Sequence, residues 1–432
     1  MTLFKTSFFS ALAVLVKLAT SLYLSKVLAI YVGPAGYGVI GQFQSLVSMV
    51  ITFASGATNT GVTKYTAEYE TDPVRQHAVW ATAATIGLLG AIVFGCALIL
   101  LREPLSRWIL DSPAHSDVVI WLALSLGLVV MNGLMLAILT GRKAVRQLVA
   151  ANIVGSLISA AVATVLVTAQ GLWGALVALA VSQAIACGFT AWMFQRVCKV
   201  RWRDLIGTID PAIAKALGGF VLMAATTAVV APIGQIVIRD QLAVSLGWEN
   251  AGLWQALLKI SETHLLLFTA TLSVYFLPRF SEIRLGNELQ SEVLSGYLFV
   301  VPLVAISGLM IYFFRESLVE ILLTEDFLPL TKVLGLQLIG DALKICSWVM
   351  SFTMVSHART RAFVVTEVLF TAIYVLATVV LARYYGLAGT AVAYSVTYLI
   401  YWATMYWLFR GLVARLRREE LASLEPTGPR EV

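Results

Sequence analysis

The chain has 432 residues, of which 59% are hydrophobic and only 12% are charged, and its mean hydropathy is +0.86. This composition excludes a soluble globular protein and indicates a polytopic membrane protein. The net charge of +6 does not indicate nucleic-acid binding, because membrane topology explains where the basic residues lie.

The first long apolar stretch, residues 8–31, carries two lysines within a segment that is long enough to cross a bilayer. It is too long and too charged for a removable signal peptide. A lysine at depth costs about 2.5–3.5 kcal/mol on insertion scales, so it usually faces water or a partner. Lys17 shares a helical face with Ser10 and Ser21, whereas Lys26 points to nearly the opposite side. We expect a cationic cavity with Lys17 as its principal residue.

Twelve apolar stretches follow one another along the chain. They lie at residues 8–31, 39–61, 78–101, 118–140, 149–169, 172–194, 215–238, 253–277, 293–314, 333–356, 363–384 and 387–409. With the N-terminus inside, the inner segments hold 19 of the 30 Lys and Arg residues. The outer segments hold 6, Arg239 among them. This asymmetry predicts that both termini lie in the cytoplasm.

A repeat relates the two halves of the chain at an offset of about 214 residues. REPLSRWIL at 102–110 matches RESLVEILL at 315–323, and GLWGALVALAVS at 171–182 matches GLAGTAVAYSVT at 386–397. The two members of each pair occupy equivalent places in the order of apolar stretches, one in each half of the chain. The two halves should therefore share one membrane orientation and be related by an axis along the membrane normal.

The predicted fold is an all-α polytopic membrane protein with twelve transmembrane helices in two parallel-repeat six-helix lobes around a central cavity. The N-terminal lobe comprises residues 1–214 and ends in a basic cytoplasmic linker, and the C-terminal lobe comprises residues 215–432 and ends in a basic cytoplasmic tail. Substrate is expected at the interface between the lobes.

The second apolar stretch carries polar residues at spacings of three and four, which places them in one stripe on a helix. The stripe comprises Gln42, Ser45, Ser48, Thr52, Ser55 and Asn59. In the other half, Lys259 and Glu262 occupy the positions that match Ser45 and Ser48. One interpretation is a hydrated interface, and the alternative is hydrogen bonding between packed helices.

The tenth stretch adds Gln337, Asp341 and Lys344 on one helical face. The pairs Lys259 with Glu262 and Asp341 with Lys344 are three residues apart, so each could neutralise itself within its helix. The alternative to a cationic cavity is therefore two ion pairs, each within one helix, whose only role is to let these helices insert into the membrane. Lys17 has no acidic residue on its own helix, which favours the cavity.

Two further titratable residues lie within apolar stretches. His264 and Glu367 are candidates for proton coupling, because His titrates near neutral pH and intramembrane carboxylates serve in relays. The alternatives are a hydrogen-bonded His and a Glu at the inner interface.

The sequence predicts no cofactor and no metal site. GPAGYG at 33–38 is followed by no Lys-Ser/Thr and preceded by no strand, so it indicates a tight turn and no phosphate loop. Cys96, Cys187, Cys198 and Cys346 form no close pair and are expected as small buried hydrophobic residues.

Four stretches carry a family resemblance that extends over essentially the whole chain. They are YVGPAGYGVIGQFQSL at 31–46, GVTKYTAEY at 61–69, GLWQALLKISETHLLLFTATLSVYFLPRFSE at 252–282 and LQLIGDALKICSWV at 336–349. They resemble the Wzx-type flippases of the multidrug/oligosaccharidyl-lipid/polysaccharide exporter superfamily, most closely the enterobacterial common antigen branch. The resemblance implies a two-lobed bundle in a bacterial inner membrane that turns an undecaprenyl-diphosphate-linked oligosaccharide to the periplasmic leaflet by alternating access. Its implied partners are that lipid, membrane lipids, and downstream polysaccharide polymerase and chain-length proteins.

The chemistry of the apolar stretches is compatible with this substrate class, since a diphosphate needs cations. Our hypothesis is that Lys17, Lys259 and Lys344 hold the diphosphate, with Lys26 as a further candidate. Glu262 and Asp341 would position these lysines or exchange protons. A cation-coupled multidrug exporter is the main alternative, although a cationic drug favours unpaired carboxylates. An enzyme is disfavoured because no segment between spans exceeds roughly twenty residues, and a structural scaffold would leave the charges at depth unexplained.

Overall fold

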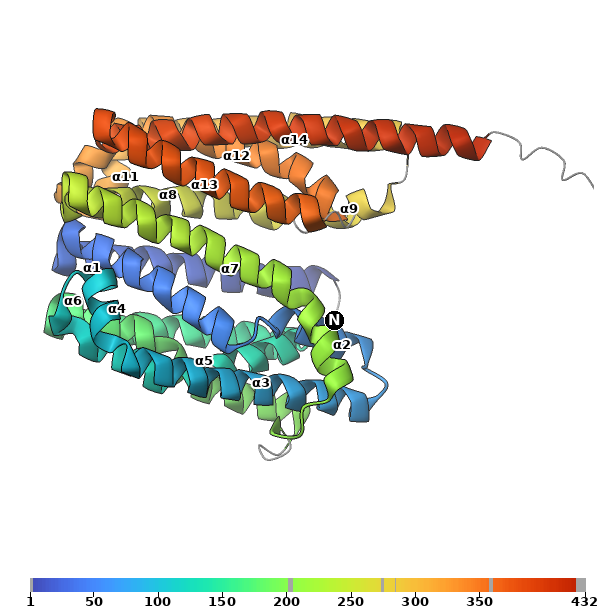
Figure 1. Ribbon diagram of the computed structural model, residues 1–432, viewed down its shortest axis with the longest axis horizontal. Helices are drawn as coiled ribbons and strands as arrows, with labels where there is room; N and C mark the ends of the chain where they lie inside the picture. The colour runs from blue at the N-terminus through green and yellow to red at the C-terminus, as the bar shows by residue number, and fades with distance from the viewer. Residues whose placement is uncertain (1–2, 201–204, 273–275, 284, 357–359, 425–432) are drawn as a thin grey trace, which may run out of the picture. The chain divides into compact units, whose positions relative to one another are not determined.

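The computed structural model describes residues 3–200, 205–272, 276–283, 285–356 and 360–424, and in these ranges helices joined by short turns and loops make up the chain (Figure 1). The α-helices are α1 (Leu3–Ala54), α2 (Asn59–Glu68), α3 (Pro73–Leu100), α4 (Arg102–Leu110), α5 (Ser116–Gly141), α6 (Val145–Cys198), α7 (Pro211–Leu246), α8 (Trp248–Thr271), α9 (Leu277–Glu282), α10 (Gly286–Phe313), α11 (Arg315–Leu322), α12 (Thr331–Ser356), α13 (Thr360–Tyr385) and α14 (Leu387–Leu424). Short 3₁₀ helices at Pro113–His115 and Glu325–Leu330 precede α5 and α12.

The helices are long and apolar enough to identify a multi-pass membrane protein. In the described ranges, eight helical segments have the length and hydropathy needed to cross a bilayer. Two of them, in α1 and α6, each contain a glycine with non-helical backbone angles, and each covers two predicted spans. α8 is not among the eight, and it carries Lys259, Glu262 and His264. The number of twelve spans stays a prediction.

Packing divides the chain into two compact units. Unit 1 comprises Met1–Gly252 with Ile321–Asp326, and unit 2 comprises Leu253–Glu320 with Phe327–Val432. This division places α7 in unit 1, whereas the repeat assigns residues from 215 onward to the second lobe. The lobes of 1–214 and 215–432 were drawn from the repeat and stay a prediction.

Each unit has its own apolar core. In unit 1, Phe43 of α1 and Leu126 of α5 are fully buried in one cluster, and Trp80 of α3 and Phe194 of α6 are fully buried in another. In unit 2 the core gathers Phe280, Ile345 and Val349 with residues of α10, α13 and α14. In a bilayer such side chains stabilise the units through close van der Waals packing, because lipid tails are as apolar as the core.

The sequence repeat corresponds to matched local geometry. α4 and α11, the two copies of the first motif, are both short helices. In the second motif, Gly171 and Gly386 occupy the left-handed region at φ 55° and φ 58°. Three residues later, a Cβ on Gly174 would lie 1.9 Å from the Leu166 carbonyl oxygen, and one on Gly389 would lie 2.2 Å from that of Leu381. Both halves therefore make the same tight turn between two helices.

The second predicted span, residues 39–61, is wrong at its C-terminal end. α1 ends at Ala54, and a turn with Gly56 at φ 60° and Ala57 at φ 50° precedes α2. The polar stripe is therefore divided, because Asn59 begins a different helix from the one that carries Gln42.

Candidate functional site

In unit 1 the central polar group is Arg239 of α7, which is only 1% exposed. This position corrects the prediction that Arg239 lies in an outer segment, because α7 continues to Leu246 and carries it inside the packed unit. The predicted span ended at 238 because an arginine lowers local hydropathy, although a hydrogen-bonded arginine can continue a helix at depth.

The guanidinium of Arg239 joins α7 to the polar stripe of α1. Its Nη1 donates to Gln42 Oε1 at 2.9 Å, and its Nη1 and Nη2 both donate to Ser45 Oγ at 3.2 Å. On its own helix, Nη2 donates to Gln235 Oε1 at 3.0 Å. Gln42 Nε2 completes the arrangement by donating to the Ile236 carbonyl at 3.3 Å. Gln42 and Ser45 are thus brought together, as the spacing predicts, but around an arginine.

The rest of the predicted stripe does not join this cluster. Ser48 is exposed, Thr52 donates to its own helix at the Ser48 carbonyl, and Ser55 is buried and donates to the Thr52 carbonyl. Asn59 lies against α5, where a Cβ on Gly133 would be 3.2 Å from its Nδ2.

The two lysines of α1 have different environments. Lys17 is exposed, and the structure shows no hydrogen bond or ion pair of its ammonium with described residues. Lys26 is half-buried and donates to the Leu323 carbonyl within unit 1. The assignment of Lys17 to a ligand stays a prediction.

In unit 2 the central polar group is Asp341 of α12, whose side chain is fully buried. Its Oδ1 accepts hydrogen bonds from Ser261 Oγ and, at 3.0 Å, from the Tyr394 hydroxyl. Its Oδ2 lies 3.4 Å from His264 Nδ1, and His264 Nε2 lies 2.9 Å from Ser307 Oγ. Asp341 therefore anchors a buried chain that links α8, α10, α12 and α14.

Gln337, Asp341 and His264 are three predicted residues that the structure brings together. Gln337 Nε2 donates to Ser261 Oγ at 3.3 Å, so one serine hydroxyl bridges Gln337 and Asp341. His264 is 2% exposed, which matches the interpretation of a hydrogen-bonded histidine as well as that of a coupling group.

Lys344 lies one turn from Asp341 but faces aromatic rings. Its Nζ lies 4.9 Å from the ring centre of Tyr398, 5.2 Å from that of Trp348 and 5.6 Å from that of Tyr394. Ring faces attract an ammonium ion. No Asp341–Lys344 ion pair within 4.0 Å exists in the described part of unit 2, so the predicted internal pair is replaced by a cage of rings.

The remaining predicted residues lie at the edge of the unit 2 cluster. Lys259 of α8 and Glu367 of α13 are half-buried, and Glu262 of α8 is exposed. Lys259 and Glu262, although three residues apart, form no ion pair within 4.0 Å of the kind found elsewhere in the described chain. This second internal pair is therefore not observed either.

The structure adds residues that sequence reasoning missed. They are Arg239, Gln235, Ser261, Ser307, Trp348, Tyr394 and Tyr398. The four-residue spacings of Gln235 with Arg239 and of Tyr394 with Tyr398 were available signals of a shared helical face. The contact between Lys344 and α14 had no such signal, because it joins different helices.

Chemically, each unit presents cations held by neutral groups. The guanidinium in unit 1 is bound by amides and a hydroxyl, and the ammonium in unit 2 lies over aromatic rings. Both are cationic donor groups of the kind that binds phosphate oxygens. Asp341 is already occupied by Ser261, Tyr394 and His264, so it is a poor site for a cationic ligand. The described residues contain no group of three His, Cys, Asp or Glu that could hold a metal ion.

Comparison with known sequences identifies relatives over most of the chain. A family model described as polysaccharide biosynthesis protein matches residues 27–332. The chain is 30% identical to the Lipid III flippase of Escherichia coli (strain K12) over 404 residues, which are 93% of this chain and 97% of that protein. The Lipid III flippase of Shigella flexneri matches to the same extent.

Comparison with solved structures shows the fold. An inward-facing multidrug resistance MATE family transporter of the MOP superfamily matches with a TM-score of 0.78 at 14% identity, over 94% of this chain and 99% of that one. The Lipid II flippase MurJ in an inward closed conformation matches with a TM-score of 0.72 at 14% identity, over 96% of this chain and 91% of that one. The chain thus shares the fold of these transporters.

Proposed function

The chain belongs to the polysaccharide biosynthesis protein family, and on that premise we propose that it is a flippase, a transporter and not an enzyme. Its substrate is an undecaprenyl-diphosphate-linked oligosaccharide, a lipid III or O-antigen-type unit, moved from the cytoplasmic to the periplasmic leaflet by alternating access. The observation that carries the proposal is the 30% identity to the Lipid III flippase of Escherichia coli across 93% of this chain.

The proposed setting is a bacterial inner membrane with both termini in the cytoplasm. The asymmetry of Lys and Arg between the predicted inner and outer segments supports this orientation. In that setting a downstream polysaccharide polymerase and chain-length proteins would receive the translocated unit.

We assign the diphosphate to Lys17, Lys259 and Lys344, with Lys26 as an accessory cation. Lys17 is exposed and Lys259 is half-buried, so both can meet a ligand. The ammonium of Lys344 lies over aromatic rings, and the carboxylates of Asp341 and Glu262 also act on it electrostatically. Ammonium groups supply charge and hydrogen bonds to phosphate oxygens. Lys26 donates to a carbonyl, so its contribution is charge at a distance.

The polar groups around these cations take supporting roles. The polar residues that we assign to the sugar path are Gln42, Ser45, Ser48, Thr52, Ser55, Asn59 and Gln337. Gln42, Ser45, Ser55 and Gln337 are buried in this structure, so they would meet the sugar only in another state of the transport cycle. Glu262, Asp341, His264 and Glu367 position the lysines or exchange protons during the cycle. The His264–Asp341 distance of 3.4 Å supports a coupling role for that pair.

The experiment that tests the function compares two readouts in cells depleted of this protein. One is the leaflet distribution of undecaprenyl-diphosphate-linked oligosaccharide, and the other is sensitivity to cationic dyes. Accumulation of the lipid in the cytoplasmic leaflet with unchanged dye sensitivity is expected. A normal lipid distribution with increased dye sensitivity would identify a cation-coupled multidrug exporter instead.

Lys17→Ala should abolish translocation while the protein remains in the membrane, because Lys17 makes no contact that holds the fold in the described part of the chain. Translocation is measured in depleted cells that carry the variant. The control is Lys64→Ala, which removes an exposed ammonium that pairs with Glu68 at 4.0 Å outside the candidate spans. Normal translocation by the Lys17 variant would refute the assignment of this lysine to the diphosphate.

A further inference from the structure

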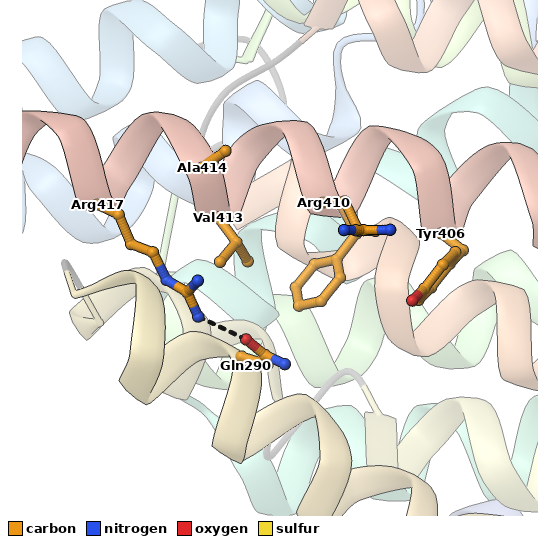
Figure 2. Close-up of a pocket in the computed structure, with 7 residues that line it drawn as sticks. Gln290, Tyr406, Arg410, Val413, Ala414 and Arg417 are labelled. Carbon is orange, nitrogen blue, oxygen red and sulfur yellow. Dashed lines mark hydrogen bonds between the residues drawn. The ribbon is translucent and has the colours of Figure 1, made fainter.

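A hollow of about 410 Å³ lies in unit 2 between the start of α10 and the second half of α14, and none of the proposed transport residues lines it. Figure 2 shows Arg410 and Arg417 projecting from α14, with Gln290 of α10 opposite. Two of the groups at this opening are therefore guanidinium ions.

The α14 side of the hollow is one helical face. Tyr406, Arg410, Val413 and Arg417 follow one another at spacings of four, three and four residues, which aligns their side chains. The two guanidinium groups start about 10 Å apart along the helix axis, since each residue rises about 1.5 Å. Phe409 and Val413 are buried and provide an apolar floor beneath them.

The α10 side holds Arg417 in place. Arg417 Nη2 donates to Gln290 Oε1 at 2.8 Å. Gly286 lets the two helices approach closely, because a Cβ there would lie 2.8 Å from Arg417 Cγ and 2.8 Å from the Val413 carbonyl oxygen. One wall of the hollow is thus fixed by backbone packing and by a hydrogen bond to a neutral amide.

The carboxylates near the start of α10 are bound to a different arginine. Arg279 of α9 lies 3.8 Å from Glu282, 3.2 Å from Glu288 and 3.5 Å from Glu292. Arg410 makes no hydrogen bond or ion pair with any residue that the structure describes. The positive charge of Arg410 is therefore available to an anion from outside the chain.

Arg410 also lies at the position of α14 where apolar sequence gives way to charge. A second hollow of about 510 Å³ shares Arg410 and is lined by Trp407, Leu408 and Gly411. Tyr406 and Trp407 are 49% and 73% exposed. Exposed Tyr and Trp next to Arg are typical of the boundary between the hydrocarbon region and the headgroups.

We propose that the hollow lined by Gln290, Arg410 and Arg417 holds the phosphate headgroup of an anionic glycerophospholipid. This lipid would be a resident lipid, distinct from the lipid that is transported. Basic pockets between helices at the membrane surface recognise such headgroups. A guanidinium ion can donate two parallel hydrogen bonds to the oxygens of one phosphate. Tyr406 and Trp407 are exposed beside Arg410, where acyl chains would lie. The lipid would brace α10 against α14 in unit 2.

The test uses the purified full-length protein in nanodiscs of phosphatidylcholine with phosphatidylglycerol, followed by delipidation and native mass spectrometry. The wild-type protein should retain phosphatidylglycerol in preference to phosphatidylcholine. Arg410→Gln should weaken retention about fivefold, and the double variant R410Q/R417Q about thirtyfold, since each basic residue near the surface contributes a comparable factor. Because Arg410 makes no hydrogen bond or ion pair with a described residue, its single variant tests the proposal without removing a polar contact of the fold.

The matched control for Arg410→Gln is Arg418→Gln, which removes one exposed charge from α14 outside the hollow. It should retain phosphatidylglycerol as the wild-type protein does. Equal loss in the control would show a general charge effect and overturn the proposal, as would full retention by R410Q/R417Q. Displacement of the lipid by millimolar inorganic phosphate, or preferential retention of added undecaprenyl diphosphate, would assign the site to another phosphate and also overturn it.

Discussion

At the residue scale, the feature with the strongest consequence for unit 1 is the arginine that joins α7 to α1. Arg239 donates to Gln42, Ser45 and Gln235, and its side chain is almost completely buried. Hydrogen bonds to a charged group contribute about 1.5–3 kcal/mol each, and a buried polar group left without its partner costs a similar amount. The cluster therefore stabilises the packing of two helices that are far apart in sequence.

A double-mutant cycle measures this contact. Gln42→Ala and Arg239→Ala should each lower the free energy of unfolding by about 2–3 kcal/mol, with a coupling energy of about 1.5–3 kcal/mol between them. Unfolding is followed in mixed detergent micelles. Ser48→Ala serves as the control, because Ser48 lies on the same helix but its side chain is exposed. Equal coupling of Ser48 and Gln42 to Arg239 would contradict the structure.

The sequence predicted one side of this contact and missed the other. The spacing of Gln42 and Ser45 showed that they share a face. Their partner could not be identified, because hydropathy alone ends a span at an arginine and gives no information about pairing between distant helices. The same reason explains why Asp341 and Lys344 were predicted to pair with each other: spacing along one helix is visible in sequence, whereas the Tyr394 hydroxyl and the Tyr398 ring come from α14.

At the scale of elements, turns divide the long apolar stretches into helices. Gly171 and Gly386 occupy the left-handed region in equivalent turns of the two halves. A Cβ added to either glycine would meet no atom within 4 Å, so only the backbone conformation requires glycine there. The repeated motifs predicted that these turns correspond. The end of α1 at Ala54 was not predicted, because residues 55–58 contain no proline and only one glycine.

Alanine at either turn glycine should cost about 1–2 kcal/mol of stability, because an L-residue at positive φ brings its Cβ close to the backbone. The thermal unfolding midpoint of Gly171→Ala and of Gly386→Ala should therefore fall. Gly188→Ala in α6 and Gly411→Ala in α14 are the controls, since both glycines are helical and also have nothing within 4 Å. The controls should be neutral or up to about 1 kcal/mol more stable; a loss equal to that at the turns would exclude backbone strain as the cause.

At the scale of the whole molecule, the apolar composition identified a polytopic membrane protein, and the length of the apolar stretches predicted its helices. Apolar stretches of about 20 residues predicted membrane-spanning helices, because a bilayer requires internally bonded backbone over that length. In the described ranges, eight helical segments have that length and hydropathy. The distribution of Lys and Arg predicts which loops face the cytoplasm, and Arg239, which is buried within unit 1, belongs to neither set of loops. The predicted orientation can be measured directly.

Cysteine labelling gives that measurement. In a variant without the four native cysteines, Ala114→Cys should react with a membrane-impermeant maleimide added to intact spheroplasts, and Lys143→Cys should react only after lysis. Both positions are exposed, and they precede and follow the transmembrane helix α5. The reverse pattern would invert the proposed topology and place the basic tail of α14 outside the cell.

The contact between Arg239 and α1 also has a consequence for biogenesis. Synthesis proceeds from the N-terminus, so α1 enters the bilayer well before residue 239 leaves the ribosome. An arginine that enters hydrocarbon alone costs about 2.5–3.5 kcal/mol, whereas one that meets Gln42 and Ser45 gains hydrogen bonds on arrival. During insertion α1 would then supply the hydrogen-bond partners of Arg239, so it would have to stay near the translocon until α7 is inserted.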